Sequence, residues 1–169
     1  KLCGINNKEI TAQEISFQIA PRINAVGRIG NPDLILSLLS ESNADKATKL
    51  AKECDNTNKK RREISNTIES EAMAIIQADN IPIPSFVVIA QSHWHPGVIG
   101  IVAARIVDRF NRPTALLARS QDGIFRASVR SPSTFSVINA LEQCSNYLES
   151  YGGHPAAGGF TIKGKNIAK

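Results

Sequence analysis

The segment from Tyr151 to Phe160 has a composition typical of a phosphate-binding loop. It holds four glycines, one histidine and one proline within ten residues. Glycine lets a backbone approach a ligand closely, and free N–H groups at a helix start can bind an anion. We expect His154 to stand at the N-cap of a very short helical turn and to contact that anion, a structural histidine being the alternative. The segment predicts a phosphate-bearing ligand but contains no obvious means of cutting one.

A predicted strand over residues 124–130 presents a second set of anion-binding groups. Alternation turns Phe125 and its apolar partners toward the core and the intervening residues toward the opposite face. Those intervening residues are Arg126, Ser128 and Arg130. Arginine binds oxyanions bidentately and serine adds a donor, which suits a phosphate. An ordinary solvent-facing strand is the alternative. We favour the phosphate site because this strand ends near the sheet that presents the glycine-rich segment.

A third candidate lies where His93 and His95 flank Trp94, at the carboxyl end of an earlier predicted strand and just before a helix. In an open α/β sheet this end is the usual ligand site. A metal site generally needs three or more suitably spaced ligands, and no third histidine or acidic cluster stands nearby. We therefore expect the histidines to contact substrate or cap the helix, with Trp94 as a lid or wedge, and no metal bound by this chain.

Residues 1–40 contain a weaker candidate cluster. The alternation of apolar and polar residues over 15–19 predicts a half-buried strand, which Pro21 ends. A turn-rich loop over 22–28 follows. Residues 31–33 then open a short helix that extends through residue 39. The candidate binding residues in this loop are Arg22, Asn24 and Arg28.

A long helix is expected from residue 43 to about residue 79. Apolar residues recur at three- and four-residue steps, and Ser42 with Asp45 fits a capping pattern. Such a helix spans on the order of 50 Å, too long for a compact small domain, so we interpret it as a strut between two lobes. Its basic run at 59–62 could touch a nucleic-acid backbone. A solvated helix surface is the better interpretation, because acidic residues lie nearby.

From residue 83 onward the pattern is that of a small α/β domain with a mixed sheet. A continuous apolar run at 86–90 suits a strand covered on both faces. It opens a β–α–β unit. The further elements expected are a helix over 96–110, a strand over 113–118, a turn at 121–123, the strand over 124–130, a helix over 134–149 and a last strand over 159–162.

Composition bounds these interpretations. The 169 residues are 42% hydrophobic, enough to bury a core, and could form one domain or one domain plus extensions. A net charge of +5 favours polyanionic partners. The three cysteines are widely spaced, which favours reduced thiols in a cytoplasmic protein. No apolar run approaches the roughly 20 residues of a membrane span, so we expect no membrane partner. Because the chain begins at Lys1 in mid-pattern, we expect a piece of something longer.

Four ordered motifs carry a resemblance to a known family. They are Phe17-Gln-Ile-Ala-Pro-Arg-Ile-Asn-Ala-Val-Gly-Arg28, Ser92-His-Trp-His-Pro-Gly-Val-Ile-Gly-Ile-Val102, Ala127-Ser-Val-Arg-Ser131 and Gly152-Gly-His-Pro-Ala-Ala-Gly158. In order and spacing they resemble the RecJ family of 5′→3′ single-strand-specific DNA exonucleases, within the DHH phosphoesterase superfamily. The resemblance covers essentially the whole chain.

The resemblance implies three parts: the tail of a catalytic DHH domain over 1–40, a connector helix over 41–82, and a DHH-associated substrate-binding domain over 83–169. It implies that Ser128 and Arg130 hold the 5′-terminal phosphate of single-stranded DNA and that His154 assists catalysis. The other residues expected to contact the strand are Arg22, Asn24, Arg28, His93, Trp94, His95, Arg126, Gly152, Gly153 and Gly158.

The departures from the family pattern limit what the chain is expected to do. The aspartate-rich and Asp-His-His motifs that hold the family's Mn²⁺ or Mg²⁺ do not occur here, nor does its oligonucleotide-binding domain. We therefore expect an inactive, strand-positioning part of a DNA repair and recombination exonuclease, which the DHH domain of the same protein completes. The alternatives are part of a DHH oligoribonuclease or cyclic-dinucleotide phosphodiesterase, or a non-catalytic nucleic-acid-binding module.

Overall fold

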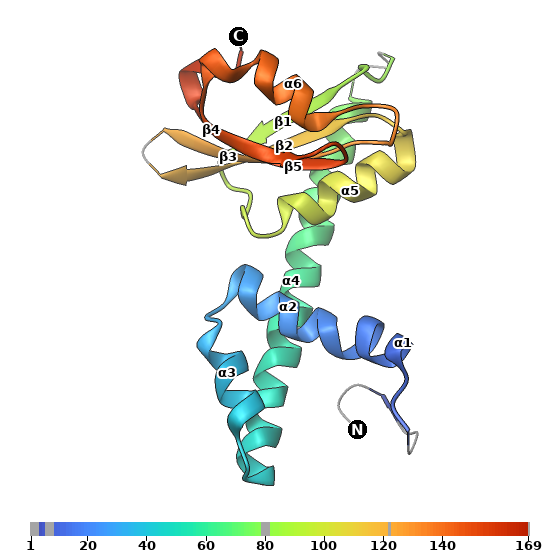
Figure 1. The fold of residues 1–169 in the computed structure, drawn as a ribbon, viewed down its shortest axis with the longest axis vertical. Coiled ribbons are helices and arrows are strands. Elements are labelled where there is room, and N and C mark those ends of the chain that lie inside the picture. The colour runs from blue at the N-terminus through green and yellow to red at the C-terminus, as the bar shows by residue number, and fades with distance from the viewer. Residues whose placement is uncertain (1–3, 6–8, 79–81, 122, 169) are drawn as a thin grey trace. The chain divides into compact units, whose positions relative to one another are not determined.

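The computed structural model describes residues 4–5, 9–78, 82–121 and 123–168 (Figure 1). The chain divides into two compact units, residues 1–64 and residues 65–169. The long helix α4 (Ala44–Gln77) contributes its first part to one unit and its last part to the other.

The first unit begins with a capped helical segment. Thr11 Oγ1 accepts the N–H of Glu14 at 3.2 Å, and Glu14 Oε2 accepts the N–H of Thr11 at 2.9 Å. This capping box starts α1 (Ala12–Glu14). The chain continues as a π-helical turn, η1 (Ile15–Ile19), and then as α2 (Ala20–Ile29).

Two predictions for this segment are wrong. Residues 15–19 form η1 instead of a strand, and residues 22–28 belong to α2 instead of a loop. Phe17 is 76% exposed, so the apolar alternation does not mark a buried face. Pro21 does not end the helical segment: it lies in the first turn of α2, which continues directly from η1. The local cap therefore outweighs the strand pattern.

The next two helices follow the prediction. Asn31 Oδ1 accepts the N–H of Asp33 at 3.0 Å at the start of α3 (Asp33–Ser40). The long helix is confirmed as α4, but the predicted cap at Ser42 is wrong. Asn43 caps α4 instead, because its Oδ1 accepts the N–H groups of Asp45 and Lys46, each at 3.0 Å.

The second unit is built on a five-stranded mixed sheet with strand order β1-β2-β3-β5-β4. Its strands are β1 (Val87–Gln91), β2 (Thr114–Gln121), β3 (Ile124–Arg130), β4 (Leu148–His154) and β5 (Ala157–Lys163). β1 and β2 are parallel and are joined through α5 (Ile99–Phe110), which confirms the predicted β–α–β unit. The other neighbouring strands pair antiparallel.

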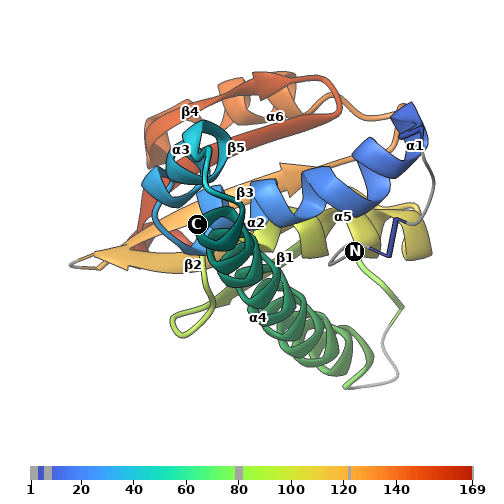
Figure 2. The ribbon, with the colours of Figure 1, turned by 90° about the horizontal axis from the view of Figure 1, so that it is seen from below.

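The helices α5 and α6 lie on opposite faces of the sheet (Figures 1 and 2). α5 contacts β2 and β3, whereas α6 (Val137–Gln143) contacts β4 and β5. The buried core on the α6 side consists of Ala115, Leu117, Ala127, Val129, Val137, Leu141 and Ile162. The predicted inward orientation of Ala127 and Val129 is thus confirmed.

The end of the chain corrects two further predictions. The helix expected over 134–149 is confined to α6, because a 3₁₀ turn (Ser145–Tyr147) follows and β4 then begins at Leu148. The glycine-rich segment is a β-hairpin formed by β4 and β5, so His154 ends a strand and does not cap a helical turn. A glycine-rich composition suits both an anion-binding loop and two closely approaching strands, and here the strand pairing prevails.

Candidate functional site

Five of the ten predicted site residues of the second unit stand in three rows across the antiparallel strands. Read from β3 through β5 to β4, the rows are Arg126–Thr161–Ser150, Ser128–Gly159–Gly152 and Arg130–Ala157–His154. Directly paired residues point to the same side of a sheet, and the rows are two residues apart. The three rows therefore share one side, which we call the polar face.

The polar face lies on the α5 side of the sheet. A Cβ atom on Gly100, in the first turn of α5, would lie 3.2 Å from Ser128 Oγ and 3.2 Å from Arg130 Nη2. The missing side chain at Gly100 thus lets the start of α5 approach both polar groups. Helix starts carry a partial positive charge, which adds to that of the guanidinium. We call this place, where Ser128 and Arg130 meet the start of α5, the anion-binding corner, after the role proposed for it below.

The polar face combines half-buried and open positions. Ser128 and Arg130 are half-buried, and Arg130 Nη1 donates to the carbonyl of Val129 at 2.7 Å. Arg126, Gly152 and His154 are exposed. A Cβ atom on Gly152 would meet no other atom within 4 Å. The polar face is therefore half-buried at the anion-binding corner and along β5, and exposed along β4.

The other glycines of the hairpin have a packing role. A Cβ atom on Gly153 would lie 2.5 Å from the carbonyl oxygen of Ala157, and one on Gly158 would lie 2.8 Å from Val137 Cγ1 of α6. Gly153 and Gly158 are paired with each other on the α6 side of the sheet. Their expected contact with a strand stays a prediction, whereas close packing already explains their identity.

The β1–α5 loop is held by a residue that the sequence analysis missed. Trp94 donates its indole N–H to Glu71 Oε2 at 2.7 Å, and His93 Nε2 lies 2.7 Å from the same oxygen. These contacts lower the pKa of the Glu71 carboxyl, the hydrogen bond from Trp94 contributing most. His95 Nδ1 accepts the N–H of Gly97 at 3.0 Å, within the loop. The N-cap of α5 is Val98, which makes no side-chain cap hydrogen bond, so the predicted capping of this helix by a histidine is wrong.

Trp94 is a buried wedge and not a lid. Its side chain is 3% exposed and so offers a strand almost no surface. His93, with 60% of its side chain exposed, remains accessible. Glu71 is distant in sequence from the loop and follows no motif, so no local pattern could have identified it.

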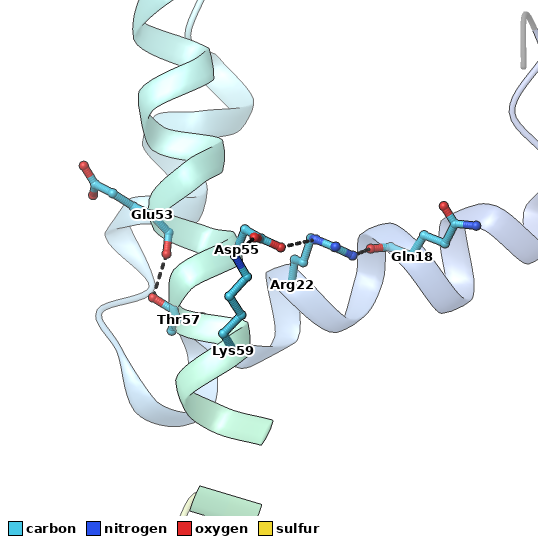
Figure 3. A network of polar contacts seen from close by, with 6 residues as sticks. All are labelled: Gln18, Arg22, Glu53, Asp55, Thr57 and Lys59. Atoms are coloured by element: carbon cyan, nitrogen blue, oxygen red, sulfur yellow. Dashed lines mark hydrogen bonds and ion pairs between the residues drawn. The ribbon is translucent and has the colours of Figure 1, made fainter. Parts of the chain in front are cut away.

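Arg22 is engaged within the first unit, as Figure 3 shows. Its Nε donates to Asp55 Oδ1 at 2.8 Å, and its Nη1 donates to the carbonyl of Gln18. Lys59 Nζ lies 3.0 Å from the other oxygen of Asp55. The hydrogen bond from Lys59, followed by the contact with Arg22, holds the pKa of Asp55 below its usual value.

The two other residues of this predicted cluster lie elsewhere on α2. Asn24 and Arg28 are exposed and stand one helical turn apart. They line a shallow hollow together with Ile23, Gly27, Pro32, Ile35 and Leu36. The structure therefore brings Asn24 and Arg28 together but not Arg22, and their expected contact with a strand stays a prediction.

Comparison with known families assigns the second unit. The DHHA1 domain family matches residues 84–169, which include the whole sheet together with α5 and α6. This chain belongs to the DHHA1 domain family. The polar face and the β1–α5 loop are thus features of a DHHA1 domain.

Relatives extend the likeness beyond the DHHA1 domain. The single-stranded-DNA-specific exonuclease RecJ of Bacillus subtilis (strain 168) is 37% identical over 168 residues, 99% of this chain and 21% of the relative. Among solved structures, RecJ from Thermus thermophilus in complex with Mn²⁺ matches with a TM-score of 0.83 at 35% identity, covering 94% of this chain and 23% of that one. The same protein in complex with Mg²⁺ matches with a TM-score of 0.82 at 33% identity, covering 94% of this chain and 24% of that one. The chain thus spans about a fifth of the length of the curated relative.

The described residues do not fit a divalent metal. Among residues 4–5, 9–78, 82–121 and 123–168, no group of three or more His, Cys, Asp or Glu side chains could hold one. Mg²⁺ and Mn²⁺ generally require several oxygen ligands, and no such group occurs among the described residues. Within the same ranges, no helix is long and apolar enough to cross a membrane.

Proposed function

We propose that the DHHA1 domain binds the backbone of single-stranded DNA along its polar face and positions the strand for a RecJ-like 5′→3′ exonuclease in DNA repair and recombination. The observation that carries the proposal is the anion-binding corner, where Ser128 and Arg130 meet the start of α5 at Gly100. The sequence similarity to RecJ, 37% identity over 99% of this chain, supports the same proposal.

Each part of the polar face has a role in this proposal. The guanidinium of Arg130 and the hydroxyl of Ser128 bind the 5′-terminal phosphate, whose oxygens accept charge-assisted hydrogen bonds. Arg126 lies two residues farther along β3 and binds a second phosphate. Gly152 leaves room for the sugar–phosphate backbone. His154, exposed at the end of β4, approaches the scissile region and assists catalysis.

The bond-breaking chemistry is proposed to lie in the rest of a longer protein. The related RecJ structures were solved with Mg²⁺ or Mn²⁺, and the donor set described above does not fit either ion. We propose that residues 1–40 belong to the catalytic DHH domain and that residues 41–82 connect it to the DHHA1 domain. Asn24 and Arg28 then line the path of the strand in that domain.

Fluorescence anisotropy tests the anion-binding corner. Labelled oligothymidylate with a 5′ phosphate or a 5′ hydroxyl is titrated with the wild-type chain, Arg130→Ala and Ser128→Ala. Arg119→Ala is the matched control: it removes an exposed arginine of β2, but Arg119 pairs with Phe125 and so points to the α6 side.

We expect Arg130→Ala to weaken binding of the phosphorylated strand at least about tenfold, the effect of losing roughly 1.4 kcal/mol, and to abolish the preference for a 5′ phosphate. Ser128→Ala should have a smaller effect in the same direction. Equal losses in Arg130→Ala and Arg119→Ala would overturn the proposed site. Cleavage of the strand by the chain in Mn²⁺ would overturn the claim that its chemistry lies elsewhere.

A further inference from the structure

The last part of α4 contacts the β1–α5 loop through one carboxylate. Glu71 Oε2 accepts the indole N–H of Trp94 and also contacts His93 Nε2, each at 2.7 Å. His93 donates in the tautomer or charge state that carries hydrogen on Nε2. One oxygen atom therefore fixes two consecutive residues of the loop, both within the second unit.

Of the two contacts of Glu71, the hydrogen bond from Trp94 matters more for stability. The indole is 3% exposed, and a buried donor without an acceptor is strongly unfavourable. The helix α4 also contacts α5, because Arg105 Nη1 of α5 donates to Glu69 Oε2 and to Asn66 Oδ1 of α4. The segment of α4 over residues 65–77 thus braces both the loop and the helix that follows it.

The braced loop leads directly to the anion-binding corner. His95 accepts the N–H of Gly97 on its ring and the N–H of Val98 on its carbonyl, the latter at 3.1 Å. α5 then starts at Ile99, and Gly100 packs against Ser128 and Arg130. Only a few residues therefore separate Trp94 from the start of α5.

We propose that Glu71 is a positioning residue for the anion-binding corner: through Trp94 it sets the β1–α5 loop and the start of α5 without touching DNA itself. The inference rests on the proposed function, since it assumes that Ser128 and Arg130 bind the 5′ phosphate. By this proposal the long helix α4 contributes to strand binding through Glu71, and not through its basic run at 59–62.

Trp94 provides a direct reporter, because it is the single tryptophan of the chain. The variants are Glu71→Ala, which removes the acceptor, and Glu71→Gln, which retains one acceptor oxygen. Glu142→Gln is the charge-matched control, since Glu142 is exposed on α6 at the other face of the sheet. Affinity for the 5′-phosphorylated strand and Trp94 emission are measured for each variant.

We expect Glu71→Ala to shift Trp94 emission and to weaken binding roughly tenfold, with Glu71→Gln retaining most of the affinity and Glu142→Gln matching the wild type. The decisive measurement is the double variant Glu71→Ala/Arg130→Ala. Because Glu71 acts through the Arg130 site, the double variant should bind no more weakly than Arg130→Ala alone.

Additive losses in the double variant, or wild-type affinity in a folded Glu71→Ala, would overturn the inference while leaving the proposed function intact. Wild-type affinity in Arg130→Ala would overturn the proposed function and the inference together. Where Glu71→Ala fails to fold, Trp94→Phe removes only the indole donor, and the same loss of affinity and the same non-additivity with Arg130→Ala are expected.

Discussion

Alanine at two adjacent glycines of β4 is expected to separate stability from strand binding. At Gly153 a Cβ atom would lie 2.5 Å from both the carbonyl oxygen of Ala157 and the Cα atom of Gly158, and φ is +155°. Backbone atoms cannot rotate away as a flexible side chain can. At Gly152, the neighbouring position, a Cβ atom would meet nothing within 4 Å.

The expected magnitudes follow from these distances. Overpacking typically costs about 1–3 kcal/mol, and a sparsely populated backbone conformation costs about 1–3 kcal/mol more, so Gly153→Ala should lower the free energy of unfolding by roughly 2–6 kcal/mol. Gly152→Ala should leave this free energy unchanged or raise it by up to about 1 kcal/mol, because alanine loses less conformational entropy than glycine on folding.

For strand binding, in contrast to stability, Gly152→Ala is the variant expected to have an effect. The methyl group of Gly152→Ala projects from the polar face, where the sugar–phosphate backbone is proposed to lie, and should weaken affinity by roughly tenfold. Urea unfolding followed by circular dichroism gives the stabilities, and fluorescence anisotropy gives the affinities. Wild-type affinity in a folded Gly152→Ala would refute the proposed path of the strand. Wild-type stability in Gly153→Ala would refute the packing explanation of that glycine.

Three further predictions concern the same unit. Gly100→Ala places a methyl group 3.2 Å from Ser128 Oγ and from Arg130 Nη2. Strand affinity should therefore fall, while the free energy of unfolding measured in urea changes little. An affinity equal to that of the wild type would contradict the packing of α5 against the anion-binding corner. Arg126→Ala should reduce the slope of log affinity against log salt concentration by about 0.7, the value for one phosphate contact to a single strand, as anisotropy titrations at several salt concentrations would show. The pKa of Glu71 is lowered from 4.5 by its contacts, so its stabilisation is present above that value and is lost as the pH falls through the lower pKa of the folded state. The free energy of unfolding of the wild type should therefore decrease more steeply below about pH 4.5 than that of Glu71→Gln, and identical pH profiles would contradict the assignment.

The sequence predicted the regular parts of the fold because their patterns are local. Alternation over 124–130 identified β3 and its two faces, and the apolar steps after residue 43 identified α4. The pattern over 15–29 is misleading, because its apolar alternation is exposed and a capping box starts a helix ahead of it. Periodicity alone does not show which side of a segment is buried.

The site was predicted in its residues but not in its geometry. Arg126, Ser128 and Arg130 share a face as expected, but only the register of β5 and β4 shows that Gly152 and His154 join them. The glycine-rich composition predicts ligand binding, whereas Gly153 and Gly158 allow close packing. Glu71 could not be predicted, because its contact with Trp94 is non-local.

Nuclear magnetic resonance of the ¹⁵N-labelled chain tests the proposed strand-binding face most directly. The guanidinium Nε–H signals of individual arginines report side chains on the two faces of the sheet, so titration with 5′-phosphorylated oligothymidylate distinguishes those faces. We predict the largest shifts at Arg130 and Arg126 and at the amide of Gly100, with Arg119 and the amides of α6 unchanged. The largest shifts at Arg119 and α6, with Arg130 unaffected, would contradict the assignment of the polar face as the strand-binding surface.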